Sequence, residues 1–371
     1  MRALLAIENL GEEPLNTTLR NAWCNPVELA IMQRVGKNNP VTPTDDDRAM
    51  ALATLIEYLS GDYDVGIVIA RDRRVEILIE HYIKQLREGR DFCHVIRDSG
   101  FRARCREALN MPSEHRSRKL RTFNVIRTTT FMAGERELAF YLRGALYFLT
   151  GVRLGPREAV LLIDYIRNGW RGEPEPGSLG GEQGPEPSTG CTPPQATTVF
   201  NLVVSVWRNT EYWVVKELRR IGNALGNPVL DVMPTGFDGL VAARVRDPVG
   251  FVHGLRRLVG AGYVLQYILR AVPVEAVVRP GINDIARTVV ELAGGRLGPG
   301  EVFEVVVRKR GVEVGRAVIT RAIVNRLIEA RLGSTARLVV DTDRVVWVEV
   351  FPAVAGVAII GKRDVFNAQK P

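Results

Sequence analysis

Basic side chains gather where an apolar run ends and a helical pattern begins. Arg308, Lys309 and Arg310 close the β-branched run that starts at position 303, and Arg316 and Arg321 follow at the start of the next helix. Phosphate groups need cations that converge on one surface, and a strand end beside a helix start supplies such a surface. The cluster fits an RNA-binding surface, but charge runs of this kind more often form a solvated rim around an α/β core, so the residues alone favour the rim.

Further cationic positions belong to the predicted surface. Lys362 and Arg363 leave the last apolar strand, and they extend the surface only if that strand ends on the same side. Arg208 follows the first strand of the C-terminal half, next to Trp207. An aromatic ring beside an arginine can stack on a base or cover the edge of a core, and for Trp207 both interpretations stay open. For Trp213 a place in the core is favoured.

Other clusters favour structural explanations. The stretch 97–127 is the densest positive run, and it predicts either a second phosphate-tracking surface or, slightly favoured, an exposed helix with scattered acids. Asp45, Asp46 and Asp47 stand where a helix N-terminus prefers acidic residues, so capping is favoured over cation binding. Four residues match no common zinc spacing, so a buried thiol and a surface histidine are favoured and no metal is expected: Cys93, His94, Cys105 and His115.

The composition fits a nucleic-acid-binding protein and argues against several other classes. The 371 residues carry a net charge of +8, and 43 of the 50 basic residues are Arg. Arg pairs bidentately with phosphate, although a general bias towards Arg would give the same count. The four cysteines form no CxxC pair, which predicts reduced thiols in a cytosol. The lack of a signal-peptide pattern and of any apolar run of about 18 residues predicts a cytoplasmic protein without a membrane span.

The elements that must position these residues fall on two sides of a linker. Residues 171–198 are rich in Gly, Pro, Glu and Ser, which predicts a flexible linker. Residues 1–170 predict a mainly α-helical domain of unknown role. The run 64–70 is either a buried strand or a helix start, because periodicity does not separate the two. The expected helices are 26–36, 45–60, 74–88, 133–149 and 156–168.

The C-terminal half predicts an α+β fold in two units. Residues 199–274 show the order β-α-β-β-α-β of a ferredoxin-like domain, in which Asp247 and Pro248 begin the second helix. Residues 275–363 form a second α/β unit, whose last strand is nearly all apolar and is therefore expected inside its sheet. A tail at 364–371 follows. The elements expected in the second unit are helices at 282–294 and 316–331 and strands at 301–308, 336–340, 345–351 and 356–360.

Several sequence features of this half occur in the same order as in the THUMP family, which this half resembles. A strand with a basic tail at 303–310 precedes a helix through Ile319, Ile323 and Leu327, and Val-Glu-Val at 348–350 precedes Gly-Val-Ala at 356–358. The preceding unit resembles the ferredoxin-like domain found before THUMP. Its marks are 200–204, Arg208 with Glu211, Gly236 with Gly239, and 267–273. The resemblance covers 199–362, under half of the chain, and the N-terminal half matches no family.

The resemblance is to stand-alone THUMP proteins of the tRNA-acetylation adaptor type, and it implies a function. Such proteins bind tRNA and present it to an acetyltransferase that forms N4-acetylcytidine, without a cofactor or catalytic domain of their own. The resemblance also implies that Arg270 lies at the junction of the two units, where it contacts RNA or pins the units together. No P-loop, no GxGxxG motif opening a helix and no GxSxG motif occurs, which favours a protein that is not an enzyme.

Two alternatives stay open for the N-terminal half. In the first, it is the catalytic domain of an RNA-modifying enzyme, which would need a cofactor pocket that the sequence does not display. In the second, it is an interaction module that docks the acetyltransferase, and the linker suits a tether of that kind.

Overall fold

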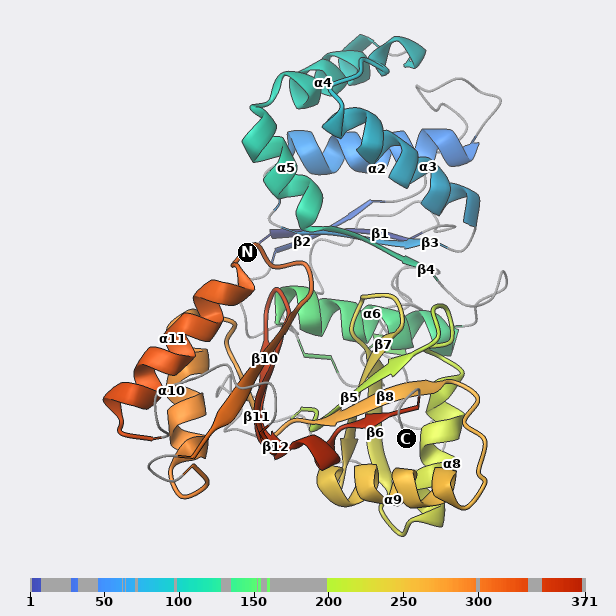
Figure 1. Ribbon diagram of the computed structural model, residues 1–371. Coiled ribbons are helices and arrows are strands. Elements are labelled where there is room, and N and C mark those ends of the chain that lie inside the picture. The colour runs from blue at the N-terminus through green and yellow to red at the C-terminus, as the bar shows by residue number, and fades with distance from the viewer. Residues whose placement is uncertain are drawn as a thin grey trace, which may run out of the picture.

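In the computed structural model, the described part of the chain forms a mixed α/β fold with three sheets (Figure 1). It describes residues 2–7, 28–32, 46–61, 63, 65–70, 73–96, 99–127, 135–151, 153–154, 159–160, 199–297, 301–332 and 342–368. The expected linker at 171–198 and the expected helix at 156–168 lie wholly or largely outside these residues. Among the described residues no helix is long and apolar enough to cross a membrane.

The N-terminal segment contains a parallel sheet. Its strands are β1 (Arg2–Ile7), β2 (Glu28–Met32), β3 (Val65–Ala70) and β4 (Phe123–Arg127), in the order β2-β1-β3-β4 with every pair parallel. The expectation of a mainly helical segment missed this sheet, and the helix expected at 26–36 was wrong because β2 occupies it. The undecided run at 64–70 is β3, whose Val68 is fully buried.

Helices cover both faces of this sheet. On one face lie α2 (Asp46–Ser60), α3 (Arg73–Arg87), α4 (Ser99–Asn110) and α5 (Ser113–Arg121), and on the other lies α6 (Glu135–Thr150) (Figure 1). Buried Leu55, Tyr58 and Phe123 pack between the sheet and the first group of helices. A parallel sheet with helices on both faces is the usual arrangement, since crossover connections place helices there.

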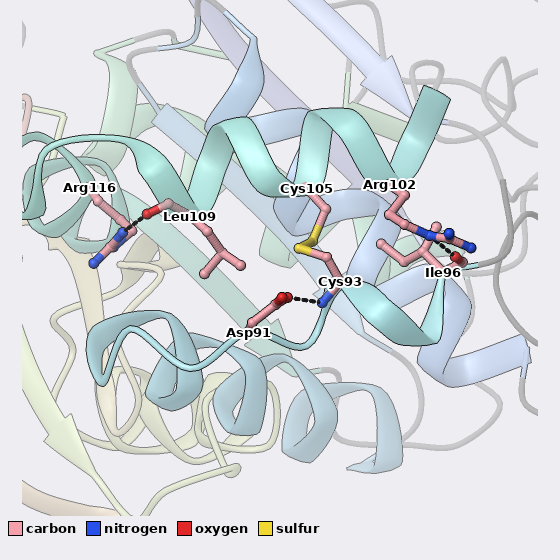
Figure 2. The surroundings of a disulfide bond; sticks show 7 residues. All are labelled: Asp91, Cys93, Ile96, Arg102, Cys105, Leu109 and Arg116. Carbon is pink, nitrogen blue, oxygen red and sulfur yellow. Dashed lines mark hydrogen bonds between the residues drawn. A yellow bond between two sulfur atoms is a disulfide. The ribbon is translucent and has the colours of Figure 1, made fainter. Parts of the chain in front are cut away.

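A disulfide joins Cys93 of the short helix η1 (Cys93–Val95) to Cys105 of α4, with the two Cα atoms 5.7 Å apart (Figure 2). The expectation of reduced thiols was therefore wrong for this pair, although both residues are buried as expected. Asp91 holds the turn by accepting a hydrogen bond from Cys93 N at 2.8 Å. Closing a loop of this length stabilises a fold by about 2–3 kcal/mol in the chain-entropy account.

The first unit of the C-terminal half has the element order β-α-β-β-α-β that the sequence predicts. Its sheet order is β13-β8-β5-β7-β6, and α8 and α9 cover one face through Leu218 and Phe251. The strand expected at 263–269 begins only at Ile268, because 261–267 form the turn that leads into it. The elements are β5 (Leu202–Val206), α8 (Val214–Ala224), β6 (Val229–Pro234), β7 (Leu240–Val245), α9 (Pro248–Gly260), β8 (Ile268–Pro273) and the edge strand β13 (Phe366–Asn367).

The second unit is a four-stranded sheet in the order β10-β11-β12-β9, with α10 and α11 on one face. Strand β12 lies inside the sheet, as its apolar sequence predicts. The strand expected at 336–340 lies outside the described residues. The elements are β9 (Ala276–Val278), α10 (Ile282–Ala293), β10 (Phe303–Lys309), α11 (Arg316–Glu329), β11 (Arg344–Val350), β12 (Ala355–Gly361) and η2 (Lys362–Asp364).

Helix α6 connects the N-terminal sheet to the C-terminal half. It packs against β3 on one side and β6 on the other. Arg143 donates to Asp231 Oδ1 at 2.7 Å and to Val232 O at 2.8 Å, and it is 6% exposed. Phe148 packs against Phe351 with ring centroids 4.7 Å apart. Although α6 precedes the expected linker, its side chains belong to the core of the C-terminal half.

The contact between α6 and β6 predicts the effect of one methyl group. A Cβ added to Gly144 would overlap the Pro234 carbonyl, so we expect Gly144→Ala to lower the free energy of unfolding by about 1–3 kcal/mol. The matched control is Gly260→Ala in α9, where an added Cβ meets nothing within 4 Å. There we expect a change within about 1 kcal/mol. Chemical denaturation of both variants measures the difference, and equal stabilities would contradict this close packing of α6.

Candidate nucleic-acid interface

The two C-terminal sheets meet through the faces that their own helices leave open. Alternation along β10 and β11 turns Val307 and Val348 towards α10 and α11, and it turns Val306 and Trp347 to the opposite face. Val272 of β8 packs on that opposite face. We call this contact, lined by Val272, Val306, Val345, Trp347, Ala358 and Ile360, the seam.

Three arginines converge at the seam. Arg308 follows Val306 on the seam side of β10, and its Cζ lies 5.9 Å from the centroid of the Trp347 ring. Arg310 follows two residues later, and Arg270 precedes Val272 by two residues on β8. Burial and then the positive charge of Arg308 lower the pKa of Arg270, with Arg310 acting in the same direction. The three side chains are therefore close enough to repel one another.

A buried carboxyl lies among these arginines. Glu349 pairs in register with Arg308 and is 4% exposed. Its Oε1 accepts a hydrogen bond from Trp347 Nε1 at 3.0 Å, while its Oε2 and Arg308 Nε are buried without a hydrogen-bond partner. Burial raises the pKa of Glu349 to about 6, although the Trp347 hydrogen bond, Arg310, Arg308 and Arg270 all act to lower it.

We call Arg270, Arg308, Arg310 and Glu349 the Arg-Glu cluster, which has a net positive charge and an unpaired donor. Three guanidinium groups and one ionised carboxylate leave a net charge of +2, and Arg308 Nε still lacks an acceptor. Guanidinium groups bind phosphate through planar pairs of N–H donors, and they do so without losing their proton. Of the residues predicted for RNA binding, the structure therefore brings together Arg270, Arg308 and Arg310.

Lys309, Arg316 and Arg321 do not join the cluster. Lys309 alternates to the helix side of β10, where its Nζ donates to Val312 O at 3.2 Å and Glu313 O at 3.4 Å. Arg316 and Arg321 are exposed on α11, which covers the helix side of the sheet. Lys309 is therefore separated from its sequence neighbours Arg308 and Arg310, because side chains alternate along a strand.

Lys362 and Arg363 lie at the other end of the same sheet. Strand β12 is antiparallel to β11, so Gly361 pairs with Arg344 while Ala355 pairs with Val350. The end of β12 is therefore far from Arg310, whose N–H donates to Val350 O. The last apolar strand therefore does not end on the same side as Arg310, and Lys362 and Arg363 do not extend the surface.

Arg208 and the two tryptophans lie in or next to the loop that follows β5. Arg208 is exposed, and Trp207 is 55% exposed. Trp213 is 37% exposed and its ring faces Lys216 Nζ at 5.7 Å from the ring centroid, so the expected place in the core was wrong. The loop before α8 leaves this ring at the surface.

The N-terminal basic stretch uses several of its charges within the fold, a role that neither the phosphate-tracking surface nor the exposed helix predicts. Arg102 Nε donates to Ile96 O at 2.7 Å, and Arg116, 9% exposed, donates to Leu109 O (Figure 2). Lys119 Nζ donates to Tyr58 O at 3.1 Å. His94 is exposed, and no group of His, Cys, Asp or Glu that could hold a metal ion occurs among the described residues.

Sequence reasoning missed Glu349 and Trp347 as members of the site. Glu349 belongs to the family resemblance only as part of Val-Glu-Val, yet it is the one carboxylate in the apolar run 345–351. A charged residue inside a strand that is buried on both faces needs a partner, and that rule is a signal that could have found it.

The N-terminal sheet offers a second candidate position. Strand β1 lies between β2 and β3, and Ile7 pairs with Ile69 near the carboxyl ends of both strands. The next strand in the chain, β2, lies on one side of β1, and the strand after it, β3, lies on the other side of β1. In open parallel sheets such a change of direction is where ligands bind, outside the carboxyl ends of the strands.

Comparison with known proteins gives only partial similarity of structure. No family model matches the chain, and no curated protein matches it in sequence. PH1313 from Pyrococcus horikoshii is 16% identical, with a TM-score of 0.33 over 43% of this chain and 55% of that one. A predicted N6-adenine-specific DNA methylase from Listeria monocytogenes is 19% identical, with a TM-score of 0.30 over 43% and 40%. A 4-thiouridine synthetase in complex with RNA and ATP is 15% identical, with a TM-score of 0.30 over 44% and 42%.

The comparison corrects one expectation. Several matched structures are described as methylases or methyltransferases, one of them in complex with SAH, so the expectation that the chain is not an enzyme is contradicted. The chain spans about half of the length of the structures it matches, or less.

Glu349 allows a test of the seam that needs no ligand. The pKa of this carboxyl rises from an ordinary 4.5 to about 6 in the folded protein. The contribution of Glu349 to the stability of the fold is therefore fully present below pH 4.5 and is lost as the pH rises through 6. Glu349→Gln removes this loss and keeps an oxygen that accepts from Trp347. We expect the stability of the variant relative to wild type to increase by about 2 kcal/mol from about pH 4 to about pH 7.

The control for this measurement is Glu304→Gln on the same sheet, where the side chain is only half-buried. Chemical denaturation across the pH range gives the difference for each variant. A difference for Glu349→Gln that is independent of pH would contradict a protonation change at this carboxyl.

Proposed function

We propose that this chain is an RNA-modifying enzyme, in which the C-terminal half binds RNA, with tRNA as the first candidate, and the N-terminal parallel sheet carries out the chemistry. The observation that carries the RNA-binding part is the convergence of Arg270, Arg308 and Arg310 around one buried carboxyl. Mutual repulsion makes such a group costly in the free protein. A phosphate that accepts hydrogen bonds from these guanidinium groups relieves the cost.

The overall charge favours a polyanion over a small anion. A net charge of +8, supplied mostly by Arg, raises the local concentration of nucleic acid around the whole molecule. The exposed Arg316 and Arg321 on α11 add to this attraction without taking part in the Arg-Glu cluster. Binding would therefore combine one defined phosphate contact with a diffuse component.

The parallel sheet supports a catalytic role for the N-terminal half. Its β1–β3 junction is the position at which open parallel sheets bind nucleotides and related cofactors. Helix α6 contacts both β3 and β6, so the N-terminal sheet is held beside the half that would bind RNA.

The Arg-Glu cluster predicts a loss of RNA affinity with a characteristic salt dependence. Arg308→Ala combined with Arg310→Ala removes two phosphate-binding side chains. We expect tRNA affinity to fall by roughly tenfold or more and the slope of log K against log salt to decrease by about 2. The control is Lys362→Ala with Arg363→Ala at the opposite end of the sheet, where a smaller change is expected. An unchanged affinity and slope in the first variant would mean that RNA binds elsewhere.

The catalytic part predicts a covalent change in RNA. The full-length chain, purified alone, is incubated with tRNA and one donor at a time: S-adenosylmethionine, acetyl-CoA or ATP. Mass spectrometry of the digested nucleosides is expected to show a modified nucleoside with one donor, and its added mass identifies the group transferred. If tRNA binds but no donor gives a product, the chemistry belongs to a separate protein and the enzymatic part of the proposal fails.

A further inference from the structure

We infer that Trp207 stacks on an unpaired base of the RNA, next to the phosphate that the Arg-Glu cluster holds. This inference rests on the proposed RNA binding and adds to it the kind of RNA: a strand with at least one unstacked nucleotide. Aromatic side chains bind single-stranded nucleic acid by stacking on bases, and this contact is tolerant of sequence because every base has a flat face.

The exposure of Trp207 has no explanation within the fold. Trp207 is 55% exposed, although large aromatic side chains usually contribute their area to a core. It is absent from every buried cluster of the described residues. Its neighbour Arg208 is also exposed.

The backbone of the loop is held firmly, which favours a fixed position for the ring. Trp207 N donates to Tyr267 O at 3.2 Å, and Thr210 Oγ1 donates to Trp207 O at 2.6 Å. Asn209 has φ of 63°, a left-handed conformation that non-glycine residues seldom adopt. The buried carboxylate of Glu211 accepts hydrogen bonds from Asn209 N and Gly239 N, so it ties this turn to the turn before β7. A ring on such a loop loses little conformational entropy when a base binds.

The position of Trp207 relates it to the Arg-Glu cluster. Arg270 pairs with Ser205 across β5 and β8, and Trp207 directly follows the end of β5, two residues after Ser205. The register shifts between Ser205 and Val206, and Trp207 N donates to the carbonyl of Tyr267, three residues before Arg270. Ser205 is on the same side of β5 as Val203, which packs with Val274 and Phe351 rather than with α8 and α9. A nucleotide whose phosphate contacts Arg270 therefore lies within reach of the exposed indole.

The local charge favours RNA over a protein partner as the occupant. Arg208 follows Trp207 in sequence and is exposed. Lys216 of the adjoining helix α8 contacts the ring of Trp213. Arg219 and Arg220 are exposed further along α8. Asp238 is an exposed acid near the loop, and it acts to raise the pKa of Glu211. Positive charge around an exposed aromatic ring matches a base that is attached to phosphates on both sides.

The test compares two RNA ligands with the full-length chain: a single-stranded oligoribonucleotide and a blunt RNA duplex of the same length. We expect Trp207→Ala to weaken single-strand binding by roughly tenfold or more and to leave the salt slope unchanged, because stacking releases no counterions. Duplex binding is expected to change little. Trp207→Tyr is expected to restore most of the lost affinity, since it keeps an aromatic face.

The control is Trp213→Ala, which removes a less exposed ring whose face is already occupied by Lys216. If wild type binds neither ligand, the proposed RNA binding itself fails. If wild type binds both but Trp207→Ala leaves single-strand affinity unchanged, or weakens both ligands equally, the stacking inference is wrong. A change in the oligomeric state of Trp207→Ala, seen by light scattering without RNA, would instead assign the ring to a protein interface.

Discussion

Each of the two C-terminal sheets carries helices on one face only, and covering the remaining faces determines how this molecule is assembled. A sheet with an apolar open face is unstable in water until another element covers it. The second unit's sheet places Trp347 and Ile360 against Val272 of the first unit. The first unit's sheet is covered in turn by α6, whose Phe148 packs with Met233 and Leu240. The Arg-Glu cluster lies where these apolar contacts end.

This constraint explains why a basic sequence motif and a basic site differ. The run Arg308, Lys309, Arg310 is continuous in sequence, but the two-residue period of a strand sends Lys309 to the helix side. The third arginine of the cluster, Arg270, comes from the other sheet, and only the packing of the two units brings it close. The charge run in the sequence identified Arg308 and Arg310, and the family resemblance placed Arg270 at the junction of the two units. Glu349, which pairs with Arg308 in the same sheet, was missed.

The fold itself was predictable to a degree that depended on how local its signals are. Asp247 and Pro248 begin α9 as predicted, with Asp247 Oδ1 accepting from Gly250 N at 2.9 Å, because a helix cap involves only four residues. The parallel N-terminal sheet was missed because its strands are short and pair with segments far away in the chain. Strand β2 illustrates the point, since its apolar residues suit a helix until β1 is present beside it. The disulfide between Cys93 and Cys105 is non-local in the same sense, because a turn brings together two residues whose spacing has no characteristic pattern.

The position of α6 has a consequence for how the molecule can be divided. Nearly all of its side chains from Glu137 to Thr150 are buried, and the surfaces they cover belong to parts of the chain on both sides of it in sequence. A fragment that begins at position 199 would leave the apolar side chains of β6 and β7 in contact with water, and it would be prone to aggregate. During synthesis, α6 must wait for more than ninety further residues before β6 and β7 are complete. The two halves are therefore one cooperative folding unit across α6, and recombination that exchanges either half for a relative must preserve this helix together with the sheet that it covers.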